Sequence, residues 1–94
     1  MLSQIPLDLK KVSSKDIDKE VLRIGMIAEL DAVNLYEQMA AMAQDKKVKT
    51  MLLDIAKEEK THMGEFQALL LNRDKQQVKE LDAGRKEVRK EVGE

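Results

Sequence analysis

The sequence predicts an all-α protein, and three observations support that prediction. Leu, Met, Ala, Glu and Lys are abundant, and these residues favour helices. Aromatic residues make up 2% of the 94 residues and β-branched residues are few, which argues against a sheet. Apolar residues recur with helical spacing along two long stretches that a short polar segment separates. We therefore expect an antiparallel two-helix hairpin followed by a short C-terminal helix.

The first part of the chain predicts a lead-in segment and one long helix. Residues 1–12 contain the only Pro and apolar residues at every second position, which favours extended chain. The helix is expected from about Lys15 to Ala43, with the serine at 13 or 14 as its N-cap. Residues 13–94 are expected to form a single helical domain, because so short a chain leaves no room for a second core.

The rest of the chain predicts two more helices. A polar break at residues 44–47 indicates a short turn, which places the flanking helices antiparallel. The second helix is expected from about Lys47 to Leu71. A highly charged third helix is expected from about Asp74 to Glu91.

The composition excludes several classes of function. Lys and Arg number 17 and Asp and Glu 18, so the net charge of −1 offers no basic surface for nucleic acid or membrane. Cysteine is absent, which excludes disulfides and thiolate ligands. No apolar run reaches the roughly 20 residues of a membrane span, and the N-terminus lacks the apolar core of a signal peptide. We expect a cytoplasmic protein without nucleic-acid or membrane partners.

One face of each long helix is apolar except near its middle. The heptad-spaced positions of the first helix are Leu22, Met26, Glu29, Val33, Tyr36, Ala40 and Ala43. Those of the second helix are Val48, Leu52, Ile55, Glu59, His62, Phe66 and Leu69. Such seams face a partner helix. Folding at the predicted turn places Glu29 level with His62, with Glu59 one turn away, so three potential metal ligands are expected to converge.

Two carboxylates in an apolar seam require a compensating cation. Burying an ion costs on the order of several kcal/mol even after relaxation. Neither seam contains Lys or Arg, so a divalent metal is the simplest compensation. Carboxylates with one imidazole suit iron(II) or manganese better than zinc.

The spacing of these ligands also predicts a partner chain. Glu59 and His62 form a Glu-x-x-His motif, which points both side chains from one helix at the same site. Di-iron centres in four-helix bundles use two such motifs and two further Glu residues. This chain supplies one motif and Glu29, which is half of that set. We expect two chains to meet across a two-fold axis, completing both the centre and a four-helix bundle.

At these residues the sequence resembles the encapsulated ferritins, a branch of the ferritin-like superfamily. The likeness is carried by Ala28-Glu29-Leu30-Asp31-Ala32-Val33-Asn34-Leu35-Tyr36 and Glu58-Glu59-Lys60-Thr61-His62, and it covers about residues 13–92. The resemblance implies a ferroxidase, an oxidoreductase that converts iron(II) to iron(III) with dioxygen at a di-iron site shared across a homodimer. It also implies a ring-shaped homodecamer inside an encapsulin nanocompartment, whose shell serves iron storage. Some archaeal relatives are fused to the shell protein, and the chain is interpreted as the N-terminal domain of such a fusion.

The resemblance also assigns roles to single residues. It makes Glu29, Glu59 and His62 the catalytic residues and metal ligands, and it places Tyr36 close to the centre. Relatives carry acidic residues around the first Glu that form an outer, metal-attracting site. Here only Asp31 remains of that site.

Two other functions stay open from the residues alone. The chain can be a metal-free helical assembly or adaptor domain, in which the same three polar residues set the register of the seams. It can also be a di-manganese or peroxide-handling ferritin-like protein. Glu58 and Glu65 flank His62 and are interpreted as solvated or as lying outside the ligand set.

Overall fold

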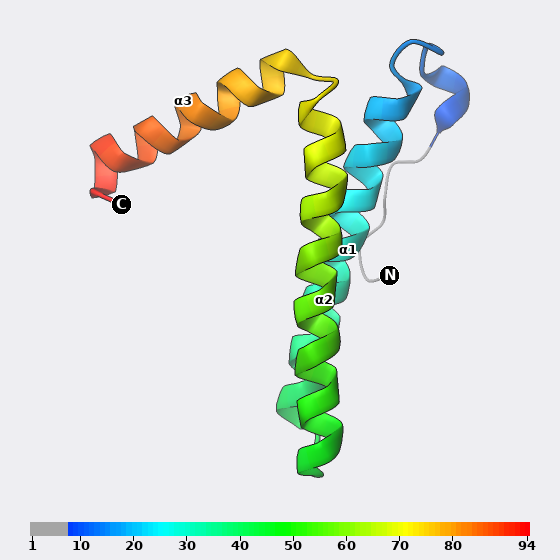
Figure 1. Ribbon diagram of the computed structural model, residues 1–94, viewed down its shortest axis with the longest axis vertical. Helices are drawn as coiled ribbons and strands as arrows, with labels where there is room; N and C mark the ends of the chain where they lie inside the picture. The colour runs from blue at the N-terminus through cyan, green and yellow to red at the C-terminus, as the bar shows by residue number, and fades with distance from the viewer. Residues whose placement is uncertain (1–7) are drawn as a thin grey trace.

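A computed structural model describes residues 8–94, and within that range the chain is all-α (Figure 1). Helix α1 spans Ile17–Met42, α2 spans Lys46–Leu71 and α3 spans Lys75–Val92. Helices α1 and α2 lie antiparallel along the longest axis, and α3 turns away from the end of α2 (Figure 1). The described residues contain no strand and no helix long and apolar enough to cross a membrane. The predicted hairpin with a short third helix is therefore confirmed.

The start of α1 differs from the sequence prediction. The helix begins at Ile17 with Asp16 at the N-cap, and the Asp16 side chain makes no capping hydrogen bond. Instead, the hydroxyl of Ser13 donates to Oδ2 of Asp16 at 3.0 Å, and the backbone N–H of Asp16 donates to the carbonyl of Ser13. The two serines therefore lie in a turn that precedes the helix, and the prediction that one of them is the N-cap was wrong.

The lead-in segment also differs in part from the extended chain that was expected. Leu9–Lys11 form a short 3-10 helix, η1, because the N–H of Lys11 donates to the carbonyl of Asp8 at 3.2 Å. The extended chain expected for residues 1–7 lies outside the described residues.

The turn between α1 and α2 is fixed by one aspartate. Asp45 is the N-cap of α2, and its Oδ1 accepts hydrogen bonds from the backbone N–H groups of Lys47 and Val48 at 2.7 and 3.2 Å. Capping satisfies N–H groups that have no partner within the helix. A short capped turn sets the register of the two helices, and the register decides which side chains meet across the hairpin.

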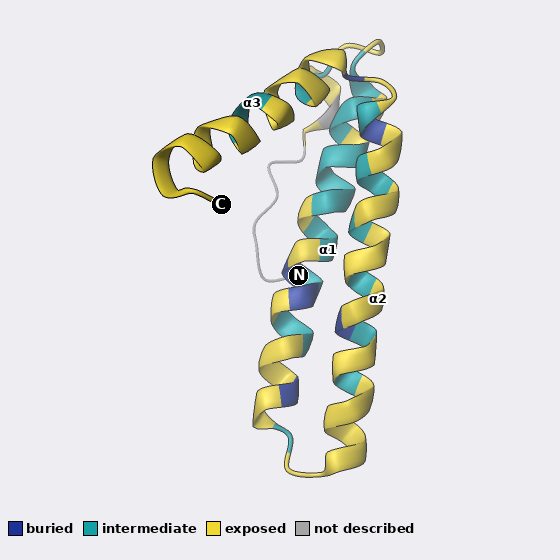
Figure 2. Cartoon of the chain, turned by 60° about the vertical axis from the view of Figure 1, so that its left-hand side comes forward, coloured by how far each residue is buried: buried dark blue, intermediate teal, exposed yellow. Residues whose placement is uncertain are grey.

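Little of the hairpin is fully buried in one chain. The buried apolar residues are Val33, Ala40, Ala56 and Leu70. Figure 2 shows exposed positions along the outer faces of all three helices, while the partly buried ones line the seam between α1 and α2. Large apolar side chains remain exposed on every helix, and Met42 reaches 80% exposure. Exposed apolar surface of this kind is typical of an interaction face.

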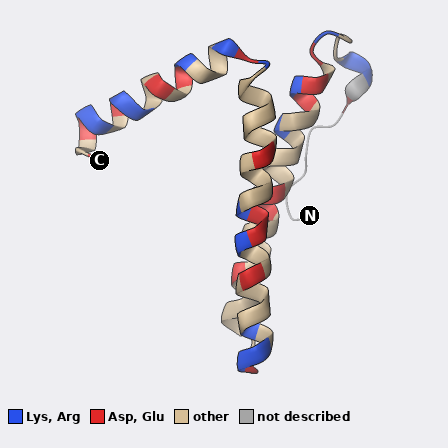
Figure 3. Ribbon diagram, in the orientation of Figure 1, with Lys and Arg blue, Asp and Glu red and all other residues tan. Residues whose placement is uncertain are grey.

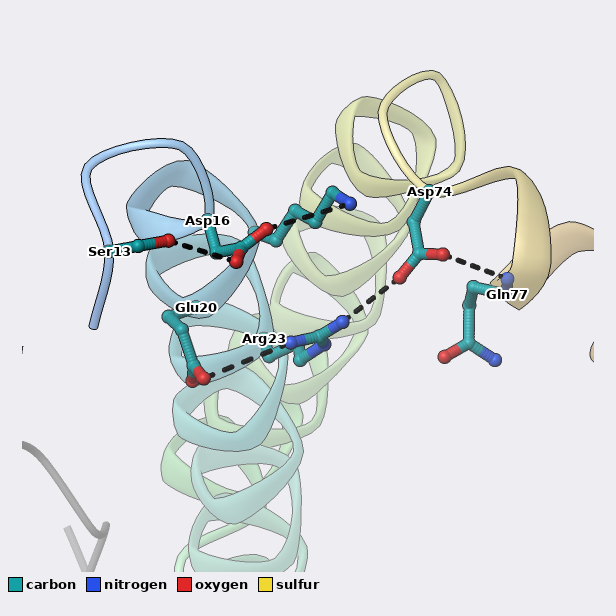
Figure 4. Close-up of polar contacts among 7 residues, drawn as sticks. Ser13, Asp16, Glu20, Arg23, Asp74 and Gln77 are labelled. Atoms are coloured by element: carbon teal, nitrogen blue, oxygen red, sulfur yellow. Dashed lines mark hydrogen bonds and ion pairs between the residues drawn. The ribbon is translucent and has the colours of Figure 1, made fainter. Parts of the chain in front are cut away.

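Helix α3 is attached to the hairpin through its first turn. Asp74 is its N-cap, and Oδ1 of Asp74 accepts from the backbone N–H of Gln77 at 3.0 Å. The other oxygen, Oδ2, accepts from Nη2 of Arg23 on α1 at 2.9 Å (Figure 4). No residue of α3 is buried, and basic and acidic residues alternate along its length (Figure 3). One carboxylate therefore caps α3 and also links it to α1.

Candidate metal centre

Three side chains from the two facing helices meet in the middle of the hairpin. Glu29 lies on α1, whereas Glu59 and His62 lie one turn apart on α2. One ligand atom from each residue lies within 4.8 Å of the other two. The heptad spacing and the capped turn together produce this convergence, as the sequence predicted. Figure 3 shows acidic residues, in red, near the middle of the hairpin.

The distances within this cluster suit a metal ion better than direct hydrogen bonds. Nδ1 of His62 lies 3.6 Å from Oε2 of Glu29 and 3.6 Å from Oε2 of Glu59. Both distances exceed those of N–H···O hydrogen bonds. Two atoms that each bind one ion at about 2.1 Å are about 3.0 Å apart at right angles and about 4.2 Å apart in line. The observed separations fall between these limits.

The burial of the cluster is uneven. The side chains of Glu29 and Glu59 are 18% and 19% exposed, whereas that of His62 is 48% exposed. Oε2 of Glu29 is buried and has no hydrogen-bond partner among the described residues. An unsatisfied buried polar group costs about 1–3 kcal/mol, and more when it is charged. Two carboxylates and one imidazole around such an oxygen fit a divalent cation of the iron or manganese type.

Two of the three clustered residues, Glu29 and His62, line a hollow on the surface of the hairpin. The hollow has a volume of about 330 Å³, and Glu29, His62, Glu65, Phe66 and Leu69 line it. Leu69 and Glu65 are both exposed, so this part of the wall of the hollow faces solvent in the single chain. A metal held by this chain alone would keep several positions open to water or to another molecule.

The other two residues that the sequence singled out lie outside the cluster. The hydroxyl of Tyr36 makes no hydrogen bond with the described residues, and Tyr36 does not line the hollow. Asp31 is buried in the single chain, with 8% exposure, which does not suit a residue that attracts ions from solvent. Roles near the metal for these two residues stay predictions.

Sequence reasoning missed two residues near the site. Phe66 was assigned to the apolar seam, and no role was predicted for Gly25. The structure places the ring of Phe66 against the backbone of α1 at Gly25, beside the hollow. The glycine inside a long helix was the signal that could have revealed the contact, because a helix-interior glycine often marks close packing.

Comparison with known proteins places the chain in a family. The profile of the EncFtn-like family matches residues 5–87, which is most of the chain. The chain belongs to the EncFtn-like family. The resemblance to encapsulated ferritins that the sequence indicated is therefore confirmed.

Two relatives from Pyrococcus furiosus support this assignment. A ferritin-like–encapsulin shell fusion protein is 52% identical over 95 residues, which cover 99% of this chain and 28% of that protein. The EncFtn-like chain thus spans little more than a quarter of the length of that relative. The crystal structure of an encapsulated ferritin domain matches with a TM-score of 0.86 and 50% identity, covering 100% of this chain and 98% of the other.

Proposed function

We propose that this EncFtn-like chain is a ferroxidase that oxidises iron(II) to iron(III) with dioxygen. The observation that carries the proposal is the buried Oε2 of Glu29, which accepts no hydrogen bond among the described residues and lies 3.6 Å from Nδ1 of His62. A carboxylate in this state favours a cation strongly, and the second carboxylate of Glu59 adds to the attraction. The donor set matches half of a di-iron centre of the four-helix type.

The second half of the site is supplied by another copy of the chain. One hairpin offers two carboxylates and one imidazole, whereas a di-iron centre in a bundle uses four carboxylates and two imidazoles. The hollow beside the ligands is open on one side, and apolar Leu69 at its edge is 46% exposed. A two-fold homodimer would cover this surface, complete the four-helix bundle and bring six ligands around two ions.

In this reaction iron is the substrate, and the protein positions it. Glu29 and Glu59 neutralise the charge of the ions, and the neutral imidazole of His62 supplies a nitrogen donor. Two neighbouring iron(II) ions can each give one electron to a single dioxygen molecule, so the reaction needs a pair of ions. The shared position of the site makes ion binding and dimer formation mutually stabilising. In the dimer, the hydroxyl of Tyr36 is expected to donate to a carboxylate close to the metal.

We further infer a larger assembly associated with an encapsulin shell. A second hollow, of about 340 Å³, lies between the three helices and is lined by apolar residues that include Ile27, Leu30 and Leu81. A second interface there would let dimers join into a ring, such as a homodecamer. The Pyrococcus fusion relative joins a ferritin-like part to an encapsulin shell protein, which supports a place inside an encapsulin nanocompartment for this chain.

Native mass spectrometry before and after anaerobic addition of iron(II) tests the shared site. We expect two iron ions for each pair of chains and a larger share of dimer-based assemblies. His62→Ala should lower the rate of iron oxidation by about 100-fold or more, because a direct ligand exceeds the tenfold to hundredfold effect of residues that only support a ligand. Its helicity, measured by circular dichroism, should stay close to that of the wild type.

The chain offers a matched control for this experiment. Glu58 and Glu59 are adjacent on α2, but Glu58 is exposed and lies outside the cluster. Glu59→Gln should lose iron binding, and Glu58→Gln should retain it. If His62→Ala lost helicity to the same extent as it lost iron oxidation, the role of His62 would be structural. An oligomer that binds no iron would indicate a metal-free helical assembly domain instead.

A further inference from the structure

The ring of Phe66, the only phenylalanine of the chain, packs against α1 at Gly25. A Cβ atom added to Gly25 would lie 2.9 Å from Cδ1 and Cε1 of Phe66 and 3.0 Å from Cγ. Cβ atoms in proteins essentially never approach other atoms so closely, so the ring would have to move. Glycine also weakens a helix interior relative to alanine. The close approach of the ring therefore accounts for a residue that the helix itself disfavours.

The contact between Gly25 and Phe66 lies directly beside the proposed metal ligands. Gly25 precedes Glu29 by one turn on α1, and Phe66 follows His62 by one turn on α2. Phe66 lines the same hollow as Glu29 and His62. Because the ring rests on the backbone of α1, it fixes the separation of the two helices one turn away from the cluster.

We propose that Gly25 and Phe66 are a positioning pair for the metal site. The ring of Phe66, seated on Gly25, lines the hollow and holds Glu29 and His62 at the separation that binds the ion. The apolar ring also limits water beside the ligands, which strengthens their interaction with a cation. Neither residue offers a ligand atom, so both act only through Glu29 and His62. This inference rests on the proposed function, because it assigns the pair to the same site.

A Cβ at position 25 would disturb the site in one of two ways. The ring either moves into the hollow, where it occupies space near the ligands, or it pushes α1 and α2 apart. Both displacements change the separation between the carboxylate of Glu29 and the imidazole of His62. Metal affinity should therefore fall even when the helices remain formed.

The test measures cobalt(II) binding by isothermal titration calorimetry, since cobalt(II) reports affinity without iron oxidation. Gly25→Ala in the full chain should bind cobalt(II) about tenfold more weakly than the wild type, the size expected when support of a ligand is lost. Gly64→Ala on α2 and Gly84→Ala on α3 are matched controls, because a Cβ at either position meets nothing within 4 Å. Both controls should bind like the wild type. Circular dichroism and native mass spectrometry follow helicity and oligomeric state in parallel.

A double-mutant cycle separates positioning from general packing. Phe66→Ala removes all three ring atoms that approach Gly25, and it should itself weaken cobalt(II) binding. Adding Gly25→Ala to Phe66→Ala should then change the affinity by less than about twofold, because residues in contact have non-additive effects. The same loss of affinity in both backgrounds would overturn the positioning pair. If Gly25→Ala fails to fold, unchanged cobalt(II) binding by Phe66→Ala would overturn it as well.

The outcome for the wild type distinguishes the two proposals. Wild-type protein that binds cobalt(II), together with a Gly25→Ala variant that binds equally well, would overturn only the positioning pair. Wild-type protein that binds no cobalt(II) and no iron(II) would overturn the metal site and the pair with it.

Discussion

Two carboxylates that lie between helices, those of Asp74 and Glu29, differ in their hydrogen bonds. The side chains of both are largely withdrawn from water, at 11% and 18% exposure. Asp74 accepts one hydrogen bond from the backbone of Gln77 and another from Arg23, so both of its oxygens have donors. Oε2 of Glu29 has no donor within hydrogen-bond distance among the described residues.

The difference shows that hydrogen-bond partners, and not burial alone, separate a structural carboxylate from a candidate ligand. A buried charge with donors holds helices in place, as Asp74 does at the start of α3. A buried charge without donors raises the energy of the fold unless a cation binds it. Among the described residues, the chain thus contains one largely buried carboxylate with donors for both oxygens and another with a buried oxygen that accepts no hydrogen bond, as we propose for a metal ligand.

The largest expected effect comes from Glu29→Gln, which keeps the shape of the side chain and removes its charge. Metal affinity should fall by about 100-fold or more, because a direct anionic ligand is lost and even a supporting residue is worth tenfold to hundredfold. The metal-free protein should become more stable by about 1 kcal/mol, because a neutral amide costs less to bury than an unpartnered carboxylate. Urea unfolding in excess chelator and cobalt(II) titration measure the two quantities.

The test depends on the opposite signs of the two changes in Glu29→Gln, a lower metal affinity and a higher stability of the metal-free protein. A metal-free Glu29→Gln protein that is less stable than the wild type would mean that the carboxylate has a structural partner. Glu29 would then resemble Asp74, and the comparison would fail. Glu58→Gln, on the exposed side of α2, should change neither quantity.

A smaller effect is expected at the other carboxylate, through Arg23→Met. This substitution keeps much of the apolar stem and removes the donor to Oδ2 of Asp74, while the cap bond from Gln77 remains. Helix α3 has 18 residues and is therefore about 27 Å long, so a tilt of about 20° moves its end by about 9 Å. Spin labels on the hairpin and near the end of α3 should show a broader distance distribution. An unchanged distribution would mean that the cap alone orients α3.

Acid unfolding gives a second measure of the Asp74 junction. The backbone hydrogen bond from Gln77 lowers the pKa of Asp74 below its ordinary value of 3.8, and Arg23 lowers it further against the opposing effect of desolvation. A lowered pKa in the folded state means that the stabilisation is present above pH 3.8 and is lost as the pH falls through the lower folded value. Arg23→Met should reduce this acid-dependent loss without abolishing it, because the larger cause remains.

Periodicity and turn chemistry predicted most of the hairpin and the cluster in its middle. The 26-residue helices repeat their apolar positions regularly, and a short turn leaves one register, so Glu29, Glu59 and His62 had to meet. The Arg23–Asp74 bond could not be predicted this way, because it joins residues 51 positions apart on elements whose angle no repeat determines. The N-cap at Asp16 was missed because three neighbouring residues can all cap a helix.

The smallest expected effect concerns a third carboxylate, Glu37, which is paired but exposed. Nζ of Lys60 on α2 lies 3.1 Å from Oε2 of Glu37 on α1, and both side chains are in water. Lys60→Gln should change the free energy of unfolding by less than about 1 kcal/mol, because exposed ion pairs are screened and cost side-chain freedom. Cobalt(II) affinity should stay within about twofold of the wild type, since long-range surface charge is screened at physiological salt. A large loss of cobalt(II) affinity would instead mean that Lys60 orients the neighbouring ligand Glu59, so that exposed residues also support the metal site.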